Sequence, residues 1–185
     1  MIDRYASIES RKPVSPVYSA EKIALRTRAL GAQITQDYQG LDLRMVTVLK
    51  GGMFFLSDLC RAIDLPLRID FMAVSSYGAG SPGVVRITKD LDDSIENAHV
   101  LVVEDIVDTG LTLSYVLKML RARNPSSLKV CTLFDKDVRR IVEPVITYSG
   151  FRVSDKFLIG YGLDFMGKYR NLPDVFSLED LRADN

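Results

Sequence analysis

Histidine and cysteine are scarce in this chain, and their scarcity argues against several kinds of catalytic site. The 185 residues include a single histidine, His99, so there is no second imidazole with which to build a zinc site or a catalytic triad. The two cysteines, Cys60 and Cys131, lie in apolar stretches without Cys-x-x-Cys spacing. We therefore expect them to be reduced core residues, not a disulfide or a metal-binding pair.

An excess of charge of one sign and long apolar runs are missing as well. Lys and Arg total 24, as do Asp and Glu, so no net charge attracts nucleic acid or a membrane surface. No apolar run approaches the roughly 20 residues of a membrane span, and the polar start of the sequence lacks the apolar region of a signal peptide. We expect a cytoplasmic protein that binds small molecules, with no nucleic acid and no membrane as partner.

The apolar residues that are present predict an α/β fold. A hydrophobic content of 47% in 185 residues is enough for a complete core, so we expect one domain over residues 1–185. Strand-like apolar runs alternate with helical spacing, the former at 43–49, 67–74, 100–103 and 128–134 and the latter at 19–34, 53–63 and 113–120. This alternation predicts a mostly parallel sheet whose ligands bind at the carboxyl ends of the strands.

The rest of the sequence is organised around residues 100–114, VLVVEDIVDTGLTLS. Four aliphatic residues predict a buried strand that ends at Glu104 and Asp105. The turn at 108–112, DTGLT, then offers hydroxyls and backbone donors at a helix N-terminus, which suits a phosphate monoester. The two acids would repel that phosphate, but a carboxylate pair can accept hydrogen bonds from a vicinal diol. The stretch therefore predicts a ribose 5-phosphate site, and the alternative is an ordinary crossover whose acids cap the helix.

Two other segments have a composition that suits a ligand. Lys50-Gly51-Gly52 follows a strand, and glycines that allow close backbone approach beside a cation suit pyrophosphate. A tight turn with a solvated lysine would have the same sequence. Residues 75–90, SSYGAGSPGVVRITKD, predict a flexible hairpin lid that excludes water from a reactive intermediate. A plain surface hairpin is the alternative there.

The segment EDIVDTGLT resembles the phosphoribosyl pyrophosphate (PRPP) motif of type I phosphoribosyltransferases, in the form found in the hypoxanthine-guanine branch. The resemblance covers roughly residues 40–173. It implies the type I phosphoribosyltransferase fold, a mostly parallel twisted sheet flanked by helices, with the lid at about 75–90. A small hood at about 150–185 would include part of the N-terminal arm.

The same resemblance implies an activity. A 5-phosphoribosyl group would pass from PRPP to hypoxanthine, and to guanine, giving IMP or GMP and pyrophosphate in purine salvage. Mg²⁺ is the implied cofactor, and a homodimer or homotetramer is the implied assembly. In this family the Leu-Lys-Gly-Gly loop contacts pyrophosphate through a non-proline cis peptide, which residues 49–52 would match.

The resemblance also implies roles for individual residues. PRPP would be bound by Lys50, Gly51, Glu104, Asp105, Thr109, Gly110, Leu111, Thr112 and Arg170. The purine would be bound by Lys136, Phe157 and Leu158, with Ser76 and Tyr77 on the lid and with Glu104, Asp105 and Asp164 as metal ligands. Asp108 is the candidate base for the imidazole-ring proton of the purine. Lys136 would donate to the 6-oxo group, which adenine lacks.

The sequence is also compatible with two rival functions. Lys136 and Phe157 argue against a pyrimidine substrate but not against xanthine, so a xanthine-preferring phosphoribosyltransferase is one alternative. A regulator that senses PRPP without turnover is another, although a neutral chain without an added nucleic-acid-binding face argues against it. The sequence departs from the family pattern at Asp137-Val138 and at 174–177, where base preference or subunit contacts could change.

Overall fold

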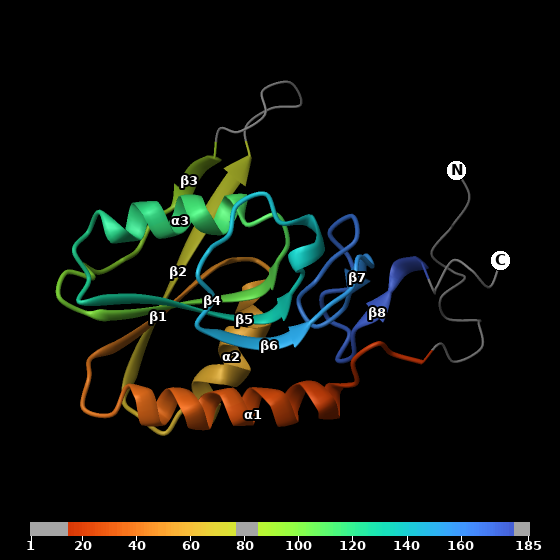
Figure 1. Ribbon diagram of the computed structural model, residues 1–185, viewed down its shortest axis with the longest axis horizontal. Helices are drawn as coiled ribbons and strands as arrows, with labels where there is room; N and C mark the ends of the chain where they lie inside the picture. The colour runs from red at the N-terminus through yellow and green to blue at the C-terminus, as the bar shows by residue number, and fades with distance from the viewer. Residues whose placement is uncertain (1–14, 77–84, 180–185) are drawn as a thin grey trace.

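A six-stranded sheet forms the centre of the molecule, which is a computed structural model that describes residues 15–76 and 85–179 (Figure 1). The strand order is β3-β2-β1-β4-β5-β6, and every neighbouring pair is parallel except β2 and β3. The strands are β1 (Leu43–Leu49), β2 (Leu67–Ser76), β3 (Val85–Lys89), β4 (His99–Val107), β5 (Ser127–Asp135) and β6 (Tyr148–Arg152). The predicted α/β fold with a mostly parallel sheet is confirmed.

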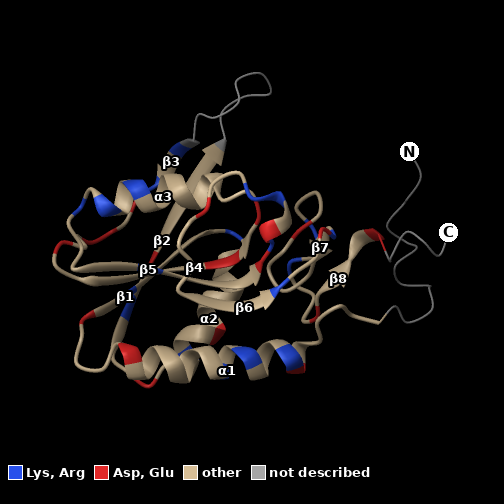
Figure 2. Ribbon diagram, in the orientation of Figure 1, with Lys and Arg blue, Asp and Glu red and all other residues tan. Residues whose placement is uncertain are grey.

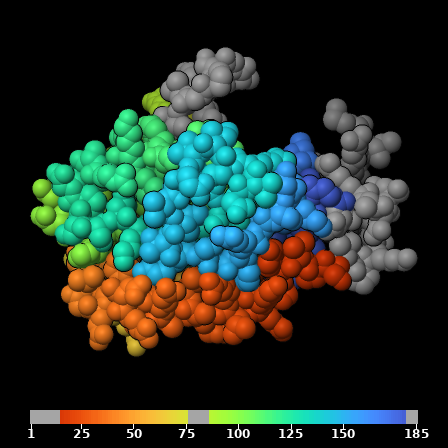
Figure 3. Space-filling model, in the orientation of Figure 1, coloured from red at the N-terminus to blue at the C-terminus, as the bar shows by residue number. Residues whose placement is uncertain are grey.

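Helices cover both faces of this sheet (Figure 1). On one face lie α1 (Ala20–Asp37), which Ser19 caps by accepting from Lys22 N–H at 3.3 Å, and α2 (Gly52–Ala62). On the other face lies α3 (Leu111–Arg121). Figure 3 shows α1 as a continuous band along one side of the molecule. Within the described ranges, no helix combines the length and the apolar character that a membrane span requires.

Each face of the sheet has its own apolar core, and β4 contributes to both. Leu101 and Val103 pack with the residues of α1 and α2, whereas Val100 and Val102 pack with those of α3. Successive side chains of a strand point to opposite faces, which explains this alternation. The same alternation directs the next residues along the strand to different faces of the sheet.

The strand β4 is longer than the sequence predicted. Glu104 was expected to end it, but the pairing with β5 continues through Ile106 and Val107, which lie opposite Phe134 and Asp135. The prediction was wrong because the aliphatic pattern resumes after the two acids and β5 still offers hydrogen-bonding partners there. Glu104 and its neighbour are therefore held on a strand, one on each face.

The predicted hairpin at 75–90 is described only in part. Its arms, β2 and β3, pair in antiparallel fashion, with Ser76 opposite Val85. Tyr77 and the remainder of the lid up to residue 84 lie outside the described residues, as does the side chain of Ser76.

A second, two-stranded sheet lies beyond the end of β6 (Figure 1). It pairs β7 (Leu158–Ile159) with β8 (Phe176–Ser177), and we use the name hood for residues 153–179. The strand β7 is only two residues long, because the chain turns at glycines with positive φ from Gly160 onwards. Val17 N–H donates to Val175 O at 2.8 Å, so the segment before α1 also contacts the hood.

Candidate active site

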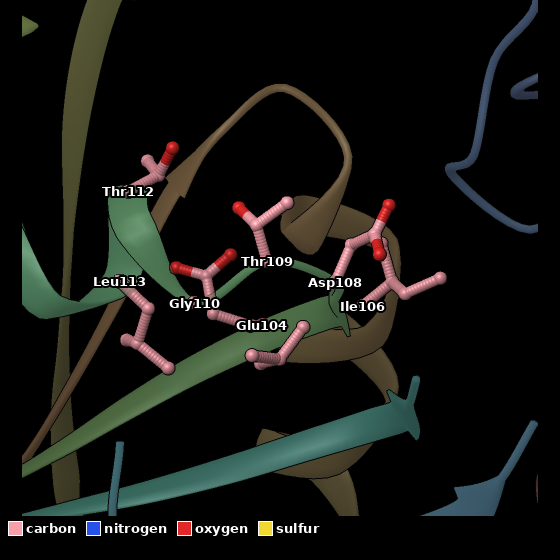
Figure 4. Close-up of a pocket in the computed structure, with 8 residues that line it drawn as sticks. Glu104, Ile106, Asp108, Thr109, Gly110, Thr112 and Leu113 are labelled. Carbon is pink, nitrogen blue, oxygen red and sulfur yellow. The ribbon is translucent and has the colours of Figure 1, made fainter. Parts of the chain in front are cut away.

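A cavity of about 240 Å³ lies where β4 turns into α3 (Figure 4). Its lining consists of one acid on the strand, the following turn and the first turn of the helix: Glu104, Ile106, Val107, Asp108, Thr109, Gly110, Thr112 and Leu113. Leu111, which was predicted to bind PRPP, begins α3 and is 49% exposed, and it does not line the cavity. The other predicted residues of this stretch come together around one space, with Asp105 as the exception.

Two carboxylate oxygens of this cavity have no partner in the described part of the chain. They are Oε1 of Glu104 and Oδ1 of Asp108, and both are buried. A buried polar atom without a hydrogen bond costs about 1–3 kcal/mol, so such atoms are usually completed by a ligand, an ion or water. Burial raises the pKa of the Glu104 carboxyl well above its usual value, and the neighbouring Asp105 adds to the effect. The cavity thus presents acceptors that suit hydroxyl donors or a cation.

The turn that begins at Asp108 also presents donors. Gly110 has φ +80°, and a Cβ at this position would lie 2.1 Å from Val142 O, so only glycine fits. This turn starts α3, whose first N–H groups have no carbonyl acceptor within the helix. Thr109 and Thr112 both line the cavity, and Figure 4 shows them on either side of Gly110. Amides, hydroxyls and the positive end of a helix dipole form an anion-binding arrangement.

Asp105 lies on the other face of the sheet, against the start of α2. A Cβ on Gly51 would lie 1.8 Å from Oδ2 of Asp105 and 3.3 Å from Nη1 of Arg170. Burial raises the pKa of the Asp105 carboxyl, and the charge of Arg170 partly opposes that rise. The Leu49–Lys50 peptide before Gly51 is cis, as the resemblance implied, and the Lys50 side chain is exposed.

The hood supplies the remaining charged groups near Asp105. Arg170 donates from Nη1 to Gly162 O at 2.6 Å, and its Nη2 lies 2.5 Å from Oδ1 of Asp164. Asp164 also accepts from Gly167 N–H at 2.8 Å. Figure 2 shows acidic and basic residues interleaved at the ends of β4 and β5 that face the hood. Segments separated by more than 100 residues of sequence thus surround one carboxylate.

The predicted purine-binding residues lie between β5 and the hood. Lys136 follows β5 and is only 5% exposed, with its Nζ 2.9 Å from Oδ1 of Asp155. Phe157 is 46% exposed and packs edge-on against Phe165 with ring centroids 5.9 Å apart. Leu158 is buried in β7, so its backbone is the part that a ligand could reach. An exposed aromatic ring beside a buried cation is an arrangement that suits a flat heterocycle with a polar edge.

Some residues of this region were missed by the sequence analysis. Asp155 pairs with Lys136 and with Arg139, and both oxygens of Glu179 accept from Phe157 N–H at 3.0 and 3.1 Å. Asp155 lies two residues before Phe157, which was assigned to the purine, and this closeness in sequence was a usable signal. Arg139 and Glu179 had none, because their partners are distant in sequence or outside any motif.

The described residues form no cluster of three or more His, Cys, Asp or Glu side chains that could hold a metal ion alone. The acids at hand are Glu104 on one face of β4, with Asp105 and Asp164 on the other. Mg²⁺ prefers one or two carboxylates together with phosphate oxygens and waters, so this donor set fits Mg²⁺ that arrives with a phosphorylated substrate.

The chain resembles known proteins over most of its length. A family model described as "Phosphoribosyl transferase domain" matches residues 13–166. A hypoxanthine-guanine phosphoribosyltransferase of Mycobacterium tuberculosis is 48% identical over 173 residues, which cover 89% of this chain and 86% of the relative. The enzyme of the same name from Streptococcus mutans is 45% identical, with 89% and 92% covered. A crystal structure of a hypoxanthine phosphoribosyltransferase from Staphylococcus aureus superposes with a TM-score of 0.87 at 43% identity and covers 95% of this chain and 96% of the other.

Proposed function

This chain belongs to the phosphoribosyltransferase family, and on that premise we propose that it transfers the 5-phosphoribosyl group of PRPP to hypoxanthine or guanine. The products are IMP or GMP and pyrophosphate, so the reaction salvages free purine bases. Relatives that carry this activity in their names match 89% of the chain at 45–48% identity.

The observation that carries the proposal is the cavity at the end of β4. Buried, unpartnered oxygens of Glu104 and Asp108 line the same cavity as the donors of the Thr109 to Thr112 turn. A ribose 5-phosphate has hydroxyl donors at its 2 and 3 positions and an anion at its 5 position. The cavity complements both ends of that molecule, and burial of a carboxylate without a partner is otherwise unfavourable.

The residues assigned to PRPP act on its two charged ends. Amides and hydroxyls of Thr109, Gly110, Leu111 and Thr112 bind the 5-phosphate, Glu104 orients the ribose diol from the cavity, and Asp105 acts on PRPP from the other face of β4, beside Arg170. Lys50, Gly51 and Arg170 bind pyrophosphate, which stabilises the charge that develops on the leaving group. Because the anomeric carbon passes through an oxocarbenium-like state, stabilisation of the leaving group lowers the barrier directly.

The purine is bound from the hood side. Phe157 stacks on its plane, the backbone at Leu158 reads its edge, and Lys136 donates to the 6-oxo oxygen. Adenine has an amino group at that position and offers Lys136 no acceptor, which explains the preference for 6-oxopurines. Asp108 accepts the imidazole-ring proton as the ring nitrogen attacks the anomeric carbon.

Mg²⁺ would be held by Glu104 at the ribose side and by Asp105 and Asp164, on the other face of β4, at the pyrophosphate side. When bound, it neutralises charge on phosphate oxygens. The unpartnered Oε1 of Glu104 supports this assignment. The protein's part is to fix the carboxylates on a rigid strand and in a turn of the hood.

We also propose the remaining features of the family for this chain. It acts as one domain over residues 1–185, with a hood that includes the segment before α1 and with a lid at 75–90 that carries Ser76 and Tyr77. The assembly is a homodimer or homotetramer in the cytoplasm. The contact of Val17 with Val175 supports the extent of the hood.

The proposal is tested by incubating the protein with PRPP, Mg²⁺ and one free base at a time, while following ultraviolet absorbance. Hypoxanthine and guanine should be converted to their monophosphates, and adenine and uracil should not. Faster conversion of xanthine would favour the xanthine-preferring alternative. Binding of PRPP without conversion of any base would favour a regulator.

A further inference from the structure

We infer that Asp155 is a positioning residue that aims the ammonium group of Lys136 at the purine and thereby sets the selectivity for an oxo group. The inference deepens the proposed function and rests on it. Asp155 lies at the start of the hood, two residues before Phe157, whereas Lys136 follows the central strand β5. The pair therefore joins the sheet to the hood at the edge of the purine site.

The ammonium group of Lys136 has two acceptors among the residues described. Its Nζ lies 2.9 Å from Oδ1 of Asp155 and donates to Lys156 O at 3.3 Å. An ammonium group has three N–H donors in fixed tetrahedral directions. When two of them are engaged, the direction of the third is fixed as well. The hood thus leaves Lys136 one donor with a defined direction, which is what recognition of a single oxo oxygen requires.

Because Lys136 is buried, its ammonium group depends strongly on its partner Asp155. The Lys136 residue is 5% exposed, so its charge has little water to solvate it and depends on the carboxylate of Asp155. Removing one partner of such a pair leaves an uncompensated buried charge, which is far costlier than losing an exposed pair. Without Asp155, the lysine would turn towards water or other acceptors, and its aim at the purine would be lost.

Arg139 holds Asp155 in place from the outside. Its Nε lies 2.6 Å from the same Oδ1 that Lys136 contacts, and the guanidinium is 58% exposed. An exposed ion pair contributes little by itself, but two cations on one oxygen fix the carboxylate's orientation. Arg139 is expected to have a smaller effect than Asp155.

The test is steady-state kinetics of Asp155→Asn, with the concentrations of hypoxanthine and PRPP varied separately. We expect the KM for hypoxanthine to rise about tenfold or more, the effect of losing roughly one charged hydrogen bond, with the KM for PRPP within about twofold of the original. Asp155→Glu should restore part of the loss. Glu143→Gln removes an exposed carboxylate from the segment between β5 and β6, the segment that carries Lys136 and Arg139, and should leave both values unchanged.

A double variant separates positioning from general damage to the hood. In a Lys136→Met background, Asp155→Asn should add less than about twofold to the KM for hypoxanthine, because the group that it positions is gone. Additive effects, or equal rises in both KM values, would overturn the inference. So would an unchanged KM for hypoxanthine in the single variant. A wild-type protein that converts no base would instead overturn the proposed function itself.

Discussion

The α-carbon of Gly51 lies against the carboxylate of Asp105, so closely that a Cβ there would be 1.8 Å from Oδ2. Gly51 itself has φ −63° and ψ −49°, a conformation that any residue adopts. The glycine is therefore required by the contact and not by the backbone. This contact brings the turn before α2 onto the acid of β4, with Arg170 of the hood beside it.

Gly51→Ala should damage PRPP use more than it damages folding. The new methyl group has to displace Asp105, and overpacking of this kind costs about 1–3 kcal/mol. We expect kcat/KM for PRPP to fall about tenfold or more, which is about 1.4 kcal/mol at the transition state. Steady-state kinetics measures the change in PRPP use, and thermal denaturation measures the change in stability. Met53→Ala, two residues on and 42% exposed, is the control that should behave like the original.

Asp108→Asn should lower turnover far more than PRPP affinity. Asn has nearly the same shape but cannot accept the purine proton, and a positioned general base contributes about 100-fold or more. Single-turnover kinetics measures the chemical step, and calorimetry measures PRPP binding. Asp93→Asn, at an exposed carboxylate, controls for the loss of one negative charge. Unchanged turnover would remove Asp108 from the role of base.

Glu104→Gln should stabilise the protein in metal-free buffer while it impairs PRPP binding. Burial raises the pKa of Glu104 in the folded state above its value of 4.5, so the folded chain resists ionisation of this group. Stability therefore falls as the pH rises above the pKa that Glu104 has in the unfolded chain. The loss reaches its full size once the pH exceeds the pKa in the folded chain. We expect Gln to increase the free energy of unfolding by about 1 kcal/mol at pH 8 and by less at pH 5.

Urea denaturation at the two pH values measures this difference. A variant that is less stable than the original at pH 8 would show that the Glu104 carboxylate is well accommodated without a ligand. The gain should also vanish when PRPP and Mg²⁺ are present, because binding stabilises the original chain by mass action.

Phe157→Ala should weaken purine binding with little effect on stability. Stacking of a base on an aromatic ring is worth about 1–3 kcal/mol, so the KM for hypoxanthine should rise about tenfold. Because the ring is 46% exposed, the unfolding free energy should change by only about 0.5 kcal/mol. Phe157→Tyr keeps the stacking face and should retain the original KM. Equal loss of PRPP binding would argue against a role specific to the base.

The strands and the nucleotide cavity were predictable because their signals are local. The apolar runs of β1, β4 and β5 are continuous, and a single turn brings Asp108 and Thr112 to one cavity. The end of β4 was misjudged because acids at a ligand-facing edge interrupt the apolar pattern without interrupting the hydrogen bonds of the sheet. A strand at its functional end therefore looks shorter in sequence than it is.

Contacts between distant segments were not predictable in the same way. Nothing near Gly51 in the sequence indicates that Asp105 and Arg170 lie against it, because that contact depends on how three segments pack. The pairing of Asp155 with Lys136 and Arg139 likewise depends on how the hood folds over β5. Sequence patterns identified the chemical groups here, and tertiary structure was needed to find their partners.

The central claim is that one crossover binds both the diol and the phosphate of a single ribose. Calorimetry of IMP, inosine and 2′,3′-dideoxy-IMP, each with the original protein, Thr112→Val and Glu104→Gln, tests it most directly. Thr112→Val should weaken the binding of IMP about tenfold but leave the affinity for inosine unchanged. Glu104→Gln should weaken the binding of IMP but leave the affinity for the dideoxynucleotide unchanged. The claim would be contradicted if Thr112→Val weakened the binding of inosine as much as that of IMP, or if Glu104→Gln weakened the binding of the dideoxynucleotide as much as that of IMP.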